Sequence, residues 1–291
     1  MATYTCNVCE RESTASSVEE ASVNSNVRAF TKESFALWRC PHCKSIHARD
    51  DVDLGHYYAQ YPFHNIKMDW MLHAMYTNQL ARLKRAGLQR SHKILDYGCG
   101  SGHFVQFLQS EGYENVRGFD EYSDKYKDRS ALDDRYDCIV SQDVIEHVPA
   151  PHALLTEFER LAKDGALIAI GTPNASAIDL KRPADFVHTI HAPYHRHILS
   201  REALVESGGK HGMKLDRFYP TMYTNTPVPF LNEAFYNYFT RFTDGTLDAT
   251  VERPLGAMLL LVLMAPITLF IGLFGAFFSR HTDVMAVFRR S

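Results

Sequence analysis

The sequence has none of the basic stretches that bind nucleic acid. Its 291 residues include 31 Lys and Arg against 34 Asp and Glu, which gives a formal net charge of −3, and basic residues never occur more than two in a row. A nucleic-acid partner normally requires a basic stripe, so we expect none. The first residues also lack the basic and then apolar pattern of a signal peptide, so we expect no secretory signal.

Internal repeats and low-complexity tracts are absent as well. Hydrophobic residues make up 45% of the chain and charged residues 22%, which is typical of a folded protein and excludes a disordered one. The length suits one large domain, or one domain with a small appendage.

Cysteine is scarce and unevenly placed. Four of the six cysteines form two Cys-x-x-Cys pairs within residues 1–50, a segment with few large apolar residues. Without a secretory signal, such pairs indicate a metal site rather than disulfides, and the metal would replace a hydrophobic core. Cys99 and Cys138 lie alone in apolar runs and are expected to be buried thiols. We predict a structural zinc ribbon with the ligands Cys6, Cys9, Cys40 and Cys43.

Residues 92–220 alternate between strand-like and helix-like runs. This alternation predicts a doubly wound, mostly parallel α/β sheet. A further helix is expected over 65–87, where Met residues recur at helical spacing and Gly87 marks the end. Strands are expected at 93–98, 115–120, 136–142, 165–173, 213–220 and 282–291, and helices at 102–112, 151–163 and 200–212.

A glycine-rich segment follows the first predicted strand of this sheet, with the sequence KILDYGCGSGHF. A dinucleotide-binding loop needs Gly-x-Gly-x-x-Gly, but the required third glycine is replaced by His103 or, in the other register, by Val105. Glycines here let the chain turn sharply and let a ligand touch the backbone. The segment reads Asp-x-Gly-x-Gly-x-Gly, from Asp96 through Gly98, Gly100 and Gly102.

This pattern resembles the first motif of class I (Rossmann-like) S-adenosylmethionine-dependent methyltransferases. The resemblance implies that the glycines and Asp96 hold the methionine moiety of the donor, and that Asp120, at the end of the next strand, accepts the ribose hydroxyls. It also implies donor contacts from Gln142 and from Tyr61. The aromatic stretch Tyr57, Tyr58 and Tyr61 would lie over the donor; simple packing of this linker onto the sheet is the alternative.

Later segments resemble one branch of this family, which contains the ubiquinone-biosynthesis O-methyltransferases and bacterial sugar and glycan methyltransferases. The resemblance covers about residues 40–220 and the last strand, and it implies a seven-stranded sheet whose last strand is antiparallel at the edge. Only sixteen residues separate Asp120 from Asp137, so the usual helix and third strand are shortened. The matching segments are YDCIVSQDVIEHVPAP, GTPNAS and HRHILSREALVESGGKHGMKL.

Asp143, Glu146 and His147 are spaced so that a helical turn would place them on one face. A downstream loop adds His188, His191, His195 and His197. Three interpretations remain open. Glu146 and His147 fix the loop by hydrogen bonds; or a histidine, with His147 and His195 as the candidates, removes a proton from the acceptor; or Asp143, Glu146, His147 and one downstream histidine hold a divalent cation, which orients a catechol-like or vicinal-diol acceptor.

Residues 255–278 form an uncharged stretch that is long enough to span a bilayer. Pro266 near its middle interrupts the hydrogen bonding of a helix, and the strand expected after it must return to the sheet. We therefore predict a monotopic insertion, bent near Pro266, on the cytoplasmic face of a membrane. A single transmembrane helix and a buried or oligomer-forming helix pair are the alternatives.

Together these patterns predict a membrane-associated S-adenosylmethionine-dependent methyltransferase. Its acceptor is expected to be a hydroxyl on a lipid-linked, quinone-precursor or glycan-related molecule. The alternatives are a non-catalytic scaffold of the same fold and a nucleotide-sugar C- or N-methyltransferase; an RNA or protein methyltransferase would leave the apolar stretch unexplained. The expected parts are the ribbon at 1–50, an aromatic lid and linker helix at 51–90, and the methyltransferase domain at 91–291 with a hydrophobic insertion at 221–282.

Overall fold

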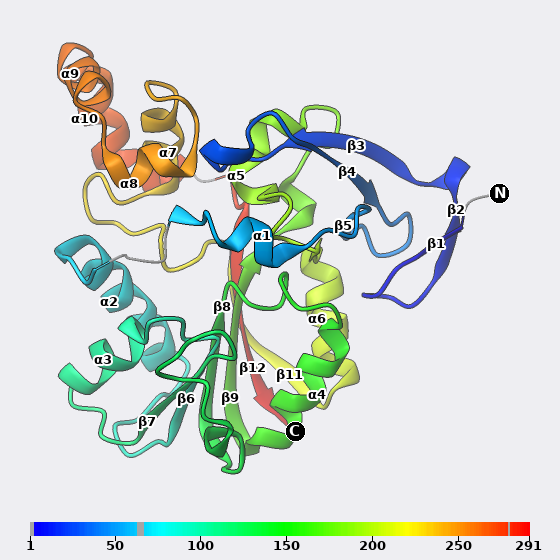
Figure 1. Ribbon diagram of the computed structural model, residues 1–291. Helices are drawn as coiled ribbons and strands as arrows, with labels where there is room; N and C mark the ends of the chain where they lie inside the picture. The colour runs from blue at the N-terminus through cyan, green and yellow to red at the C-terminus, as the bar shows by residue number, and fades with distance from the viewer. Residues whose placement is uncertain (1–2, 63–66, 279) are drawn as a thin grey trace.

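A six-stranded sheet lies at the centre of the computed structural model, which describes residues 3–62, 67–278 and 280–291 (Figure 1). Its strand order is β11-β12-β9-β8-β6-β7. The four strands β7, β6, β8 and β9 are parallel, while β12 runs antiparallel to both β9 and β11. The strands are β6 (Ile94–Tyr97), β7 (Val116–Phe119), β8 (Tyr136–Gln142), β9 (Ala162–Pro173), β11 (Met213–Tyr219) and β12 (Asp283–Arg290).

Two expectations about this sheet are corrected. The described residues form six strands in it and not seven, because the short segment between Asp120 and Asp137 holds a turn, closed by Asp120 N–H donating to the Tyr126 carbonyl at 3.0 Å, and a 3-10 helix, Arg129–Leu132. The last strand is antiparallel as predicted, but β12 lies between β9 and β11 and not at the edge.

Apolar side chains alternate along the strands and build a core on each face of the sheet. Leu95, Ile139 and Ile168 pack with residues of α4 and α6, while Ile94 and Cys138 pack with residues of α2 and α3 on the other face. Successive side chains of a strand point to opposite faces, so a parallel sheet covered by helices needs apolar residues at both. The helices are α2 (Trp70–Arg85), α3 (His103–Ser110), α4 (Pro151–Leu161) and α6 (Arg201–Lys210).

The predicted helices and strands of this domain are confirmed within a few residues at their ends. The helix expected over 65–87 is observed as α2, whose first turn is capped by Asp69, which accepts from Leu72 N–H at 2.9 Å. Residues 65 and 66 of that prediction lie outside the described residues, as do residues 63–66 of the predicted lid.

The N-terminal segment forms a hairpin and a second, four-stranded sheet. The hairpin pairs β1 with β2, and the sheet has the order β10-β5-β4-β3. Its outer strand β10, His197–Ile198, follows β9 in the chain and pairs with β5. The predicted ribbon is thus completed by residues outside 1–50. Its strands are β1 (Thr3–Thr5), β2 (Glu12–Thr14), β3 (Glu19–Asn24), β4 (Ser34–Arg39) and β5 (Ile46–Ala48).

The segment between β11 and β12 folds into helices at the top of the molecule in Figure 1. The uncharged stretch forms α9 and α10, which meet at 96° beside Pro266, so the predicted bend is confirmed. Neither helix alone is long enough to cross a bilayer. Within the described residues, only the two helices of the bent pair together have the length and apolar composition of a membrane-spanning segment. The helices are α7 (Glu233–Thr240), α8 (Leu247–Glu252), α9 (Leu255–Leu263) and α10 (Ala265–Phe274).

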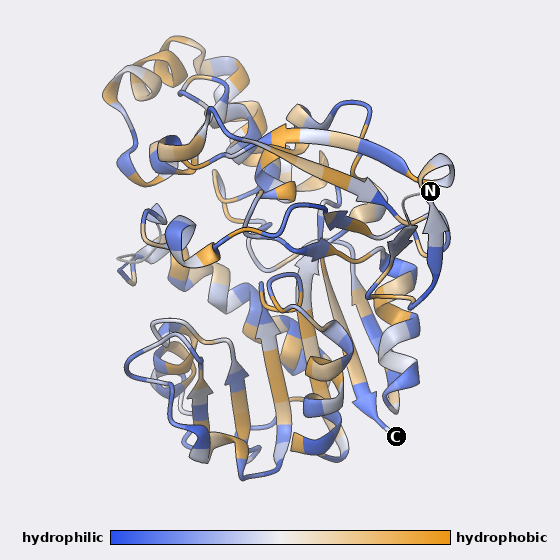
Figure 2. Cartoon of the chain, turned by 45° about the vertical axis from the view of Figure 1, so that its right-hand side comes forward, coloured by the Kyte–Doolittle hydropathy of each residue, from blue (hydrophilic) through white to orange (hydrophobic). Residues whose placement is uncertain are grey.

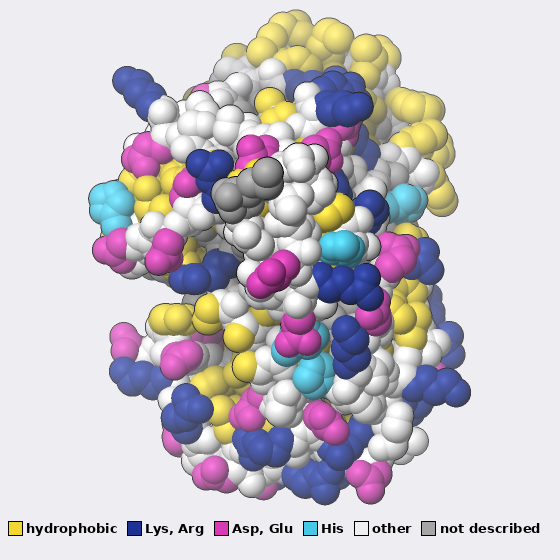
Figure 3. Space-filling model, turned by 90° about the vertical axis from the view of Figure 1, so that its right-hand side faces the viewer, with side chains coloured by type: hydrophobic (Ala, Val, Ile, Leu, Met, Phe, Trp, Pro, Cys, Tyr) yellow, Lys and Arg dark blue, Asp and Glu magenta, His cyan; other side chains and the backbone are white. Residues whose placement is uncertain are grey.

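Large apolar side chains cover the outer surface of this helix pair. Leu255 is 82% exposed, Leu263 is 77% exposed and Phe277 is 80% exposed. Figure 2 shows the two helices in hydrophobic colours at the top of the chain, and Figure 3 shows hydrophobic side chains gathered there. A patch of this kind marks an interaction surface.

Two short helices, α1 (Leu54–Tyr58) and α5 (Val187–Ile190), lie between this segment and the central sheet.

Candidate functional site

The loop between β6 and α3 is shaped by its glycines. Gly98 has a φ of +78°, and an added Cβ would lie 2.2 Å from Val144 Cγ2. Gly102 has a φ of +75°, and an added Cβ would meet the ring of Tyr126 at 2.2 Å. Gly100 also has a positive φ, +53°, but nothing lies within 4 Å of the place of its Cβ. The open side of Gly100 is therefore where a ligand can touch the backbone.

Asp120 ties this loop to the end of β7. Its Oδ2 accepts from Gly100 N–H at 2.9 Å, and its Oδ1 accepts from Tyr122 N–H at 2.9 Å. A carboxylate can accept about four hydrogen bonds, so capacity remains for a ligand hydroxyl. The ribose contact of Asp120 stays a prediction, and the structure adds a second task for this residue in shaping the loop.

Four carboxyl groups crowd the carboxyl end of the sheet. Burial raises the pKa of Asp96 to about 7, with Asp120 adding to the effect. Burial and Asp283 raise the pKa of Asp143 to about 7, and burial and Glu233 raise that of Asp283 to about 7. Asp143 nevertheless keeps part of its surface exposed to solvent. The fourth group, Glu146, has a pKa well above its usual range, mainly through burial and then through Asp143.

None of these carboxyl groups forms an ion pair with a Lys or Arg of residues 3–62, 67–278 or 280–291. With pKa values of about 7, Asp96, Asp143 and Asp283 are partly protonated at neutral pH, and a ligand with net positive charge favours their ionised form whereas an anionic pyrophosphate opposes it. S-adenosylmethionine carries a sulfonium and an ammonium against one carboxylate, so the charge of the site fits this donor and disfavours a dinucleotide.

Gln142 ends β8 beside the loop. Its amide presses against Gly171, where an added Cβ would lie 1.8 Å from Gln142 Oε1. Both Oε1 and Nε2 are buried and have no hydrogen-bond partner within the described part of the chain. A buried amide without partners is costly, so this side chain is available to a ligand. With the open face of Gly100, it gives the donor predicted from the sequence a place that the residues fit.

Tyr61 lies in an aromatic cluster and not alone over the loop. Its ring centroid is 5.0 Å from that of Tyr194, 5.7 Å from that of Tyr58 and 5.6 Å from that of His191. Burial, the largest cause, raises its pKa, so the phenol is protonated at neutral pH. Its contact with the donor stays a prediction. The ring contacts agree with the alternative interpretation, in which the aromatic linker simply packs against the rest of the chain.

Glu146 is fully buried in the turn that follows β8. Its Oε2 accepts from the Thr172 hydroxyl at 3.0 Å, whereas its Oε1 has no hydrogen-bond partner among the residues described. Its main-chain carbonyl accepts from Arg196 N–H at 2.9 Å, which fixes the loop as one interpretation expected. An unpartnered buried carboxylate oxygen calls for a ligand with positive charge or a proton.

The histidines around Glu146 are held in one tautomer by their partners. His147 Nδ1 lies 3.0 Å from the Tyr194 carbonyl, and His195 Nδ1 lies 3.0 Å from the Thr189 carbonyl. A carbonyl only accepts, so both Nδ1 atoms carry hydrogen and both Nε2 atoms are lone-pair acceptors. Burial lowers the pKa of His147 to about 4 and that of His195 well below its usual value. Tyr58 Oη also contacts His147 Nδ1, at 3.1 Å.

Glu146, His147 and His195 place one ligand atom each within 4.8 Å of one another. Neutral imidazoles whose other nitrogen donates to a carbonyl, together with a carboxylate, are a typical donor set for a divalent cation. The chemistry of these residues therefore fits such an ion.

The predicted cation set is corrected at Asp143, which is not part of this group. The prediction assumed a helical turn, but Asp143 has a left-handed φ of +54° and the following residues form a non-helical turn. The spacing therefore does not place Asp143 on the face of Glu146 and His147. His195, one of the downstream histidines, joins them instead.

Two residues of the site were not identified from the sequence. Thr172 donates to Glu146, and Asp283 adds to the negative charge. Val284 pairs with Thr172 across β12 and β9, so Asp283 begins β12 where β9 ends. The antiparallel direction of the last strand, which was predicted, is the signal that could have placed Asp283 at this edge.

The four N-terminal cysteines come together as predicted. Cys6 Sγ and Cys43 Sγ are 3.6 Å apart, Cys9 Sγ and Cys40 Sγ are 3.7 Å apart, and all four sulfurs lie within 4.8 Å of one another. Four converging thiols fit a closed tetrahedral zinc site. Of the two remaining cysteines, Cys138 is buried as expected. Cys99 is only half-buried because it lies in the glycine loop between β6 and α3, which we call the donor loop.

A search of curated proteins finds no match to this chain. Among solved structures, the chain is similar to coclaurine N-methyltransferase bound to N-methylheliamine and SAH, with 15% identity, 77% of this chain and 74% of that chain covered, and a TM-score of 0.46. It is similar to an S-adenosylmethionine-dependent methyltransferase from Mesorhizobium loti, with 16% identity, 73% and 98% covered, and a TM-score of 0.42. A third is the cyclopropane synthase MmaA2 from Mycobacterium tuberculosis, with 17% identity, 73% and 84% covered, and a TM-score of 0.43.

The family model described as "Methyltransferase domain" matches residues 71–217, which is half of the chain. The match begins in α2 and ends in β11, so it includes the glycine loop, Asp120 and the turn with Glu146 and His147. The chain therefore belongs to the methyltransferase-domain family, and its sheet with the donor loop after β6 is that of an S-adenosylmethionine-dependent methyltransferase.

Proposed function

We propose that this protein transfers a methyl group from S-adenosylmethionine to a hydroxyl of a lipid-linked, quinone-precursor or glycan-related acceptor at a membrane surface. One observation carries the proposal of a hydroxyl acceptor. Beside the donor loop, Glu146 Oε1 has no partner in the described chain, and Glu146, His147 and His195 each offer one ligand atom within 4.8 Å of the others. A hydroxyl is a weak nucleophile at neutral pH, and such a cluster is what activates one.

On the donor side, the residues bind and orient. S-adenosylmethionine supplies an electrophilic methyl group, so the protein needs mainly to align the acceptor with it, which is worth about 7–11 kcal/mol. Asp96 and the open face of Gly100 would receive the methionine moiety, and Asp120 the ribose. Gln142 would use its unpartnered amide.

On the acceptor side, we propose that Glu146, His147 and His195 hold a divalent cation. Bound there, the ion would lower the pKa of an acceptor hydroxyl and orient a vicinal diol or catechol. The neutral state of both histidines, which burial imposes, leaves their lone pairs free to ligate. Their low pKa values make them poor proton acceptors at pH 7, which favours this role over that of a general base.

Aromatic side chains surround the cluster and suit a flat or ring-shaped acceptor. Tyr58 contacts His147, Tyr194 stacks on His191 at 4.6 Å between ring centroids, and Tyr236 donates toward His188 Nδ1 at 3.3 Å. Burial raises the pKa of Tyr58 to about 12, so its hydroxyl is protonated at neutral pH. Rings stack on aromatic faces, which agrees with the quinone-related and glycan-related branch that the sequence motifs resemble.

The bent pair α9–α10 would hold the enzyme at the membrane. Its outer residues are exposed and apolar, and no Lys, Arg, Asp or Glu occurs from 255 to 278. The same segment reaches the site through α7, whose Tyr236 contacts His188. An acceptor anchored in the bilayer would therefore arrive close to the histidines, so we propose a monotopic protein and a membrane-borne acceptor.

Transfer of radioactive methyl groups tests this function. The full chain, purified in detergent, is incubated with tritiated S-adenosylmethionine, Mn²⁺ and a membrane-lipid extract, and the lipid phase is counted and treated with base to separate esters from ethers. We expect label in the lipid phase that is lost with Glu146→Gln and retained with the surface variant Glu206→Gln. Donor binding without transfer to lipid, glycan or protein acceptors would instead identify a non-catalytic scaffold.

A further inference from the structure

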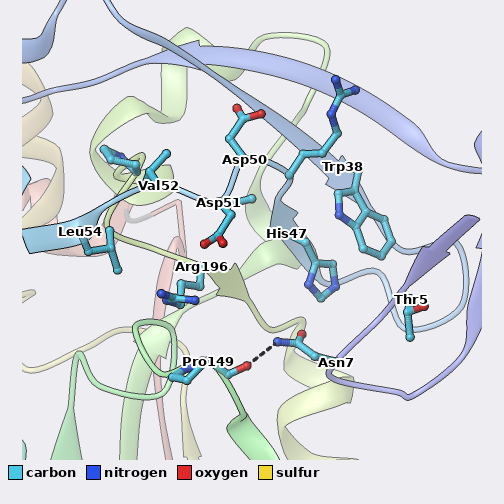
Figure 4. Close-up of a pocket in the computed structure, with 13 residues that line it drawn as sticks. Thr5, Asn7, Trp38, His47, Asp50, Asp51, Val52, Leu54, Pro149 and Arg196 are labelled. Atoms are coloured by element: carbon cyan, nitrogen blue, oxygen red, sulfur yellow. Dashed lines mark hydrogen bonds between the residues drawn. The ribbon is translucent and has the colours of Figure 1, made fainter. Parts of the chain in front are cut away.

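The first Cys-x-x-Cys pair lies against the turn that carries Glu146 and His147. The two residues between its cysteines make the contacts: Asn7 Nδ2 donates to the Pro149 carbonyl at 3.1 Å (Figure 4), and the Val8 carbonyl accepts from His152 Nε2 at 2.8 Å. Pro149 follows the turn closely, and His152 lies in the first turn of α4. The geometry of this pair is therefore transmitted to the chain just after the cluster.

His197 makes the contact just before the cluster. Its Nε2 lies 2.8 Å from the Ile145 carbonyl and its Nδ1 lies 3.3 Å from Asn7 Nδ2. The carbonyl only accepts, so Nε2 carries the hydrogen, and Nδ1 then accepts from the amide of Asn7. His197 is 1% exposed, so water does not compete for these bonds. The Asn7 amide thus uses both N–H groups, one on Pro149 and one on His197.

A third contact holds Glu146 itself. Arg196 N–H donates to the Glu146 carbonyl at 2.9 Å, and the Arg196 carbonyl in turn accepts from Ala48 N–H at 2.9 Å. This places the pairing of β10, an outer strand of the N-terminal sheet, with its neighbour β5 directly behind the turn. Carbonyls 145, 146 and 149 are therefore all held by residues of the ribbon or of the strand that completes it.

Packing alone does not hold the turn on this side. A cavity of about 250 Å³ lies at the junction, lined in part by Asn7, His47, Pro149 and Arg196 (Figure 4). Asn7 also leaves its Oδ1 buried and without a partner in the described residues. A leucine of similar size would avoid that cost, so the amide contributes its two N–H groups and not simply volume.

We propose that the Cys6–Cys9 pair positions the Glu146–His147 turn for methyl transfer, with Asn7 and His197 as the positioning residues. This inference rests on the proposed function of that turn. The four thiols fit a zinc ion, and with the ion bound they fix the backbone of Asn7 and Val8 between two of its ligands. Loss of the metal would free the backbone of Asn7 and so weaken its hydrogen bonds to the Pro149 carbonyl and to His197, which in turn holds the Ile145 carbonyl. The turn with Glu146 and His147 would then lose its fixed position. The ribbon is thus a support for the reaction centre.

The test uses the full chain with its metal and compares substitutions that keep or remove individual bonds. Asn7→Leu removes both N–H donors at similar volume. His197→Gln keeps a donor at the place of Nε2 for the Ile145 carbonyl, whereas His197→Asn is too short to reach it. His42→Ala is the control, because His42 lies between the cysteines of the second pair, at the place that Val8 has in the first, and its Nε2 contacts the carbonyl of the ribbon residue Glu12 at 3.3 Å.

Two kinds of measurement follow for each protein. Hydrogen–deuterium exchange by mass spectrometry reports the protection of residues 144–149, and elemental analysis reports the zinc content. Tritium transfer to membrane-lipid extract gives kcat and the KM for the donor. We expect Asn7→Leu and His197→Asn to speed exchange of 144–149 about tenfold and to lower kcat about tenfold to a hundredfold, with the donor KM and the zinc content unchanged. His42→Ala should resemble the wild type. His197→Gln, which keeps the Ile145 bond but loses the acceptor for Asn7, should lie between the wild type and His197→Asn, and chelation of zinc should speed the same exchange.

The exchange result decides the proposal independently of the proposed function. Unchanged protection of 144–149 in Asn7→Leu and His197→Asn, or after removal of zinc, overturns it. Faster exchange with unchanged kcat also overturns it, because the turn is then held but not for the reaction. If the wild type transfers no methyl group at all, the proposed function fails. The exchange data alone then still show whether the Cys6–Cys9 pair holds the Glu146–His147 turn in place.

Discussion

His147 and His195 meet edge to face, with ring centroids 4.8 Å apart and an angle of 76° between the ring planes. Each donates Nδ1–H to a main-chain carbonyl, so two Nε2 lone pairs point away from those carbonyls. Glu146 is adjacent, with one oxygen unpartnered in the described chain. Burial lowers the pKa of both rings, so both are neutral at pH 7 and keep a lone pair for the cation that we propose they ligate.

This arrangement predicts that Mn²⁺ binds to the protein and that Glu146→Gln weakens the binding by at least about tenfold. The substitution keeps the size and the hydrogen bond with Thr172 but removes the negative charge that the carboxyl group would take on when it ligates a cation. Free Mn²⁺ is measured by electron paramagnetic resonance during titration. Glu206→Gln, an exposed position on α6, is the control and should bind like the wild type. Equal affinity of Glu146→Gln and wild type would show that the cluster holds no cation.

Donor binding should strengthen as the pH rises through about 7. In the donor-free protein, burial raises the pKa of Asp96 to about 7, and a positively charged donor favours the ionised carboxylate. Binding therefore releases a proton, and affinity should fall by up to about tenfold per pH unit below 7 and level off above it. Calorimetry in buffers of different ionisation enthalpy measures both quantities. Asp96→Asn should bind more weakly and lose part of the pH dependence; a wild-type affinity that is flat from pH 5 to 8 contradicts the assignment.

The same groups give the donor-free protein an opposite pH dependence of stability. A pKa raised from its usual value near 4 to about 7 means that the folded state binds more protons than the unfolded state between these values. The contribution of these three carboxyl groups to the free energy of unfolding therefore falls as the pH rises from about 4 to 7, and is constant above. The difference in unfolding free energy between the wild type and Asp96→Asn, from urea titrations at several pH values, measures the share of Asp96, which saturating donor should reverse.

Gly100→Ala separates the role of the loop in folding from its role in binding. Gly100 and Gly165 share a positive φ, +53° and +74°, and both have open space at the Cβ position. Alanine at either place should cost about 1–2 kcal/mol of stability through backbone strain. Only Gly100 faces the predicted donor, so a methyl group there should weaken donor binding at least about fivefold, as crowding of a filled site does. Gly165→Ala should leave affinity unchanged. Equal affinities for both variants would move the donor away from this loop.

The central sheet was predictable because its signals are local. The strand expected at 136–142 is observed as β8 with the same ends, since an apolar run before a turn needs no distant partner to be recognised. The donor loop was equally accessible, because Gly98, Gly100 and Gly102 all have a positive φ, a local backbone requirement that the spacing of the glycines already indicates.

The reaction centre was less predictable because distant contacts build it. The spacing of Asp143, Glu146 and His147 indicated a helical turn, but the left-handed conformation of Asp143 removes it from the cluster. Thr172, at the end of β9, and His195, in the loop before β10, reach Glu146 and His147, and nothing in their local sequence shows this. β10 has two residues and exists only through pairing with β5, so no periodicity could reveal it.

Vesicle binding tests the apolar helix pair. Leu255, Val262 and Leu263 are 82%, 70% and 77% exposed, and each aliphatic side chain buried in a bilayer contributes about 1.5–3 kcal/mol. Replacing all three with Asn should lower partition into vesicles of phosphatidylethanolamine and phosphatidylglycerol at least about a hundredfold in a flotation assay. Trp70→Asn, which removes a 64% exposed apolar side chain from α2, should leave binding unchanged. Wild-type protein that stays with the aqueous phase and sediments as a dimer, which the triple variant does not form, would identify the helix pair as an interface between two copies of the chain.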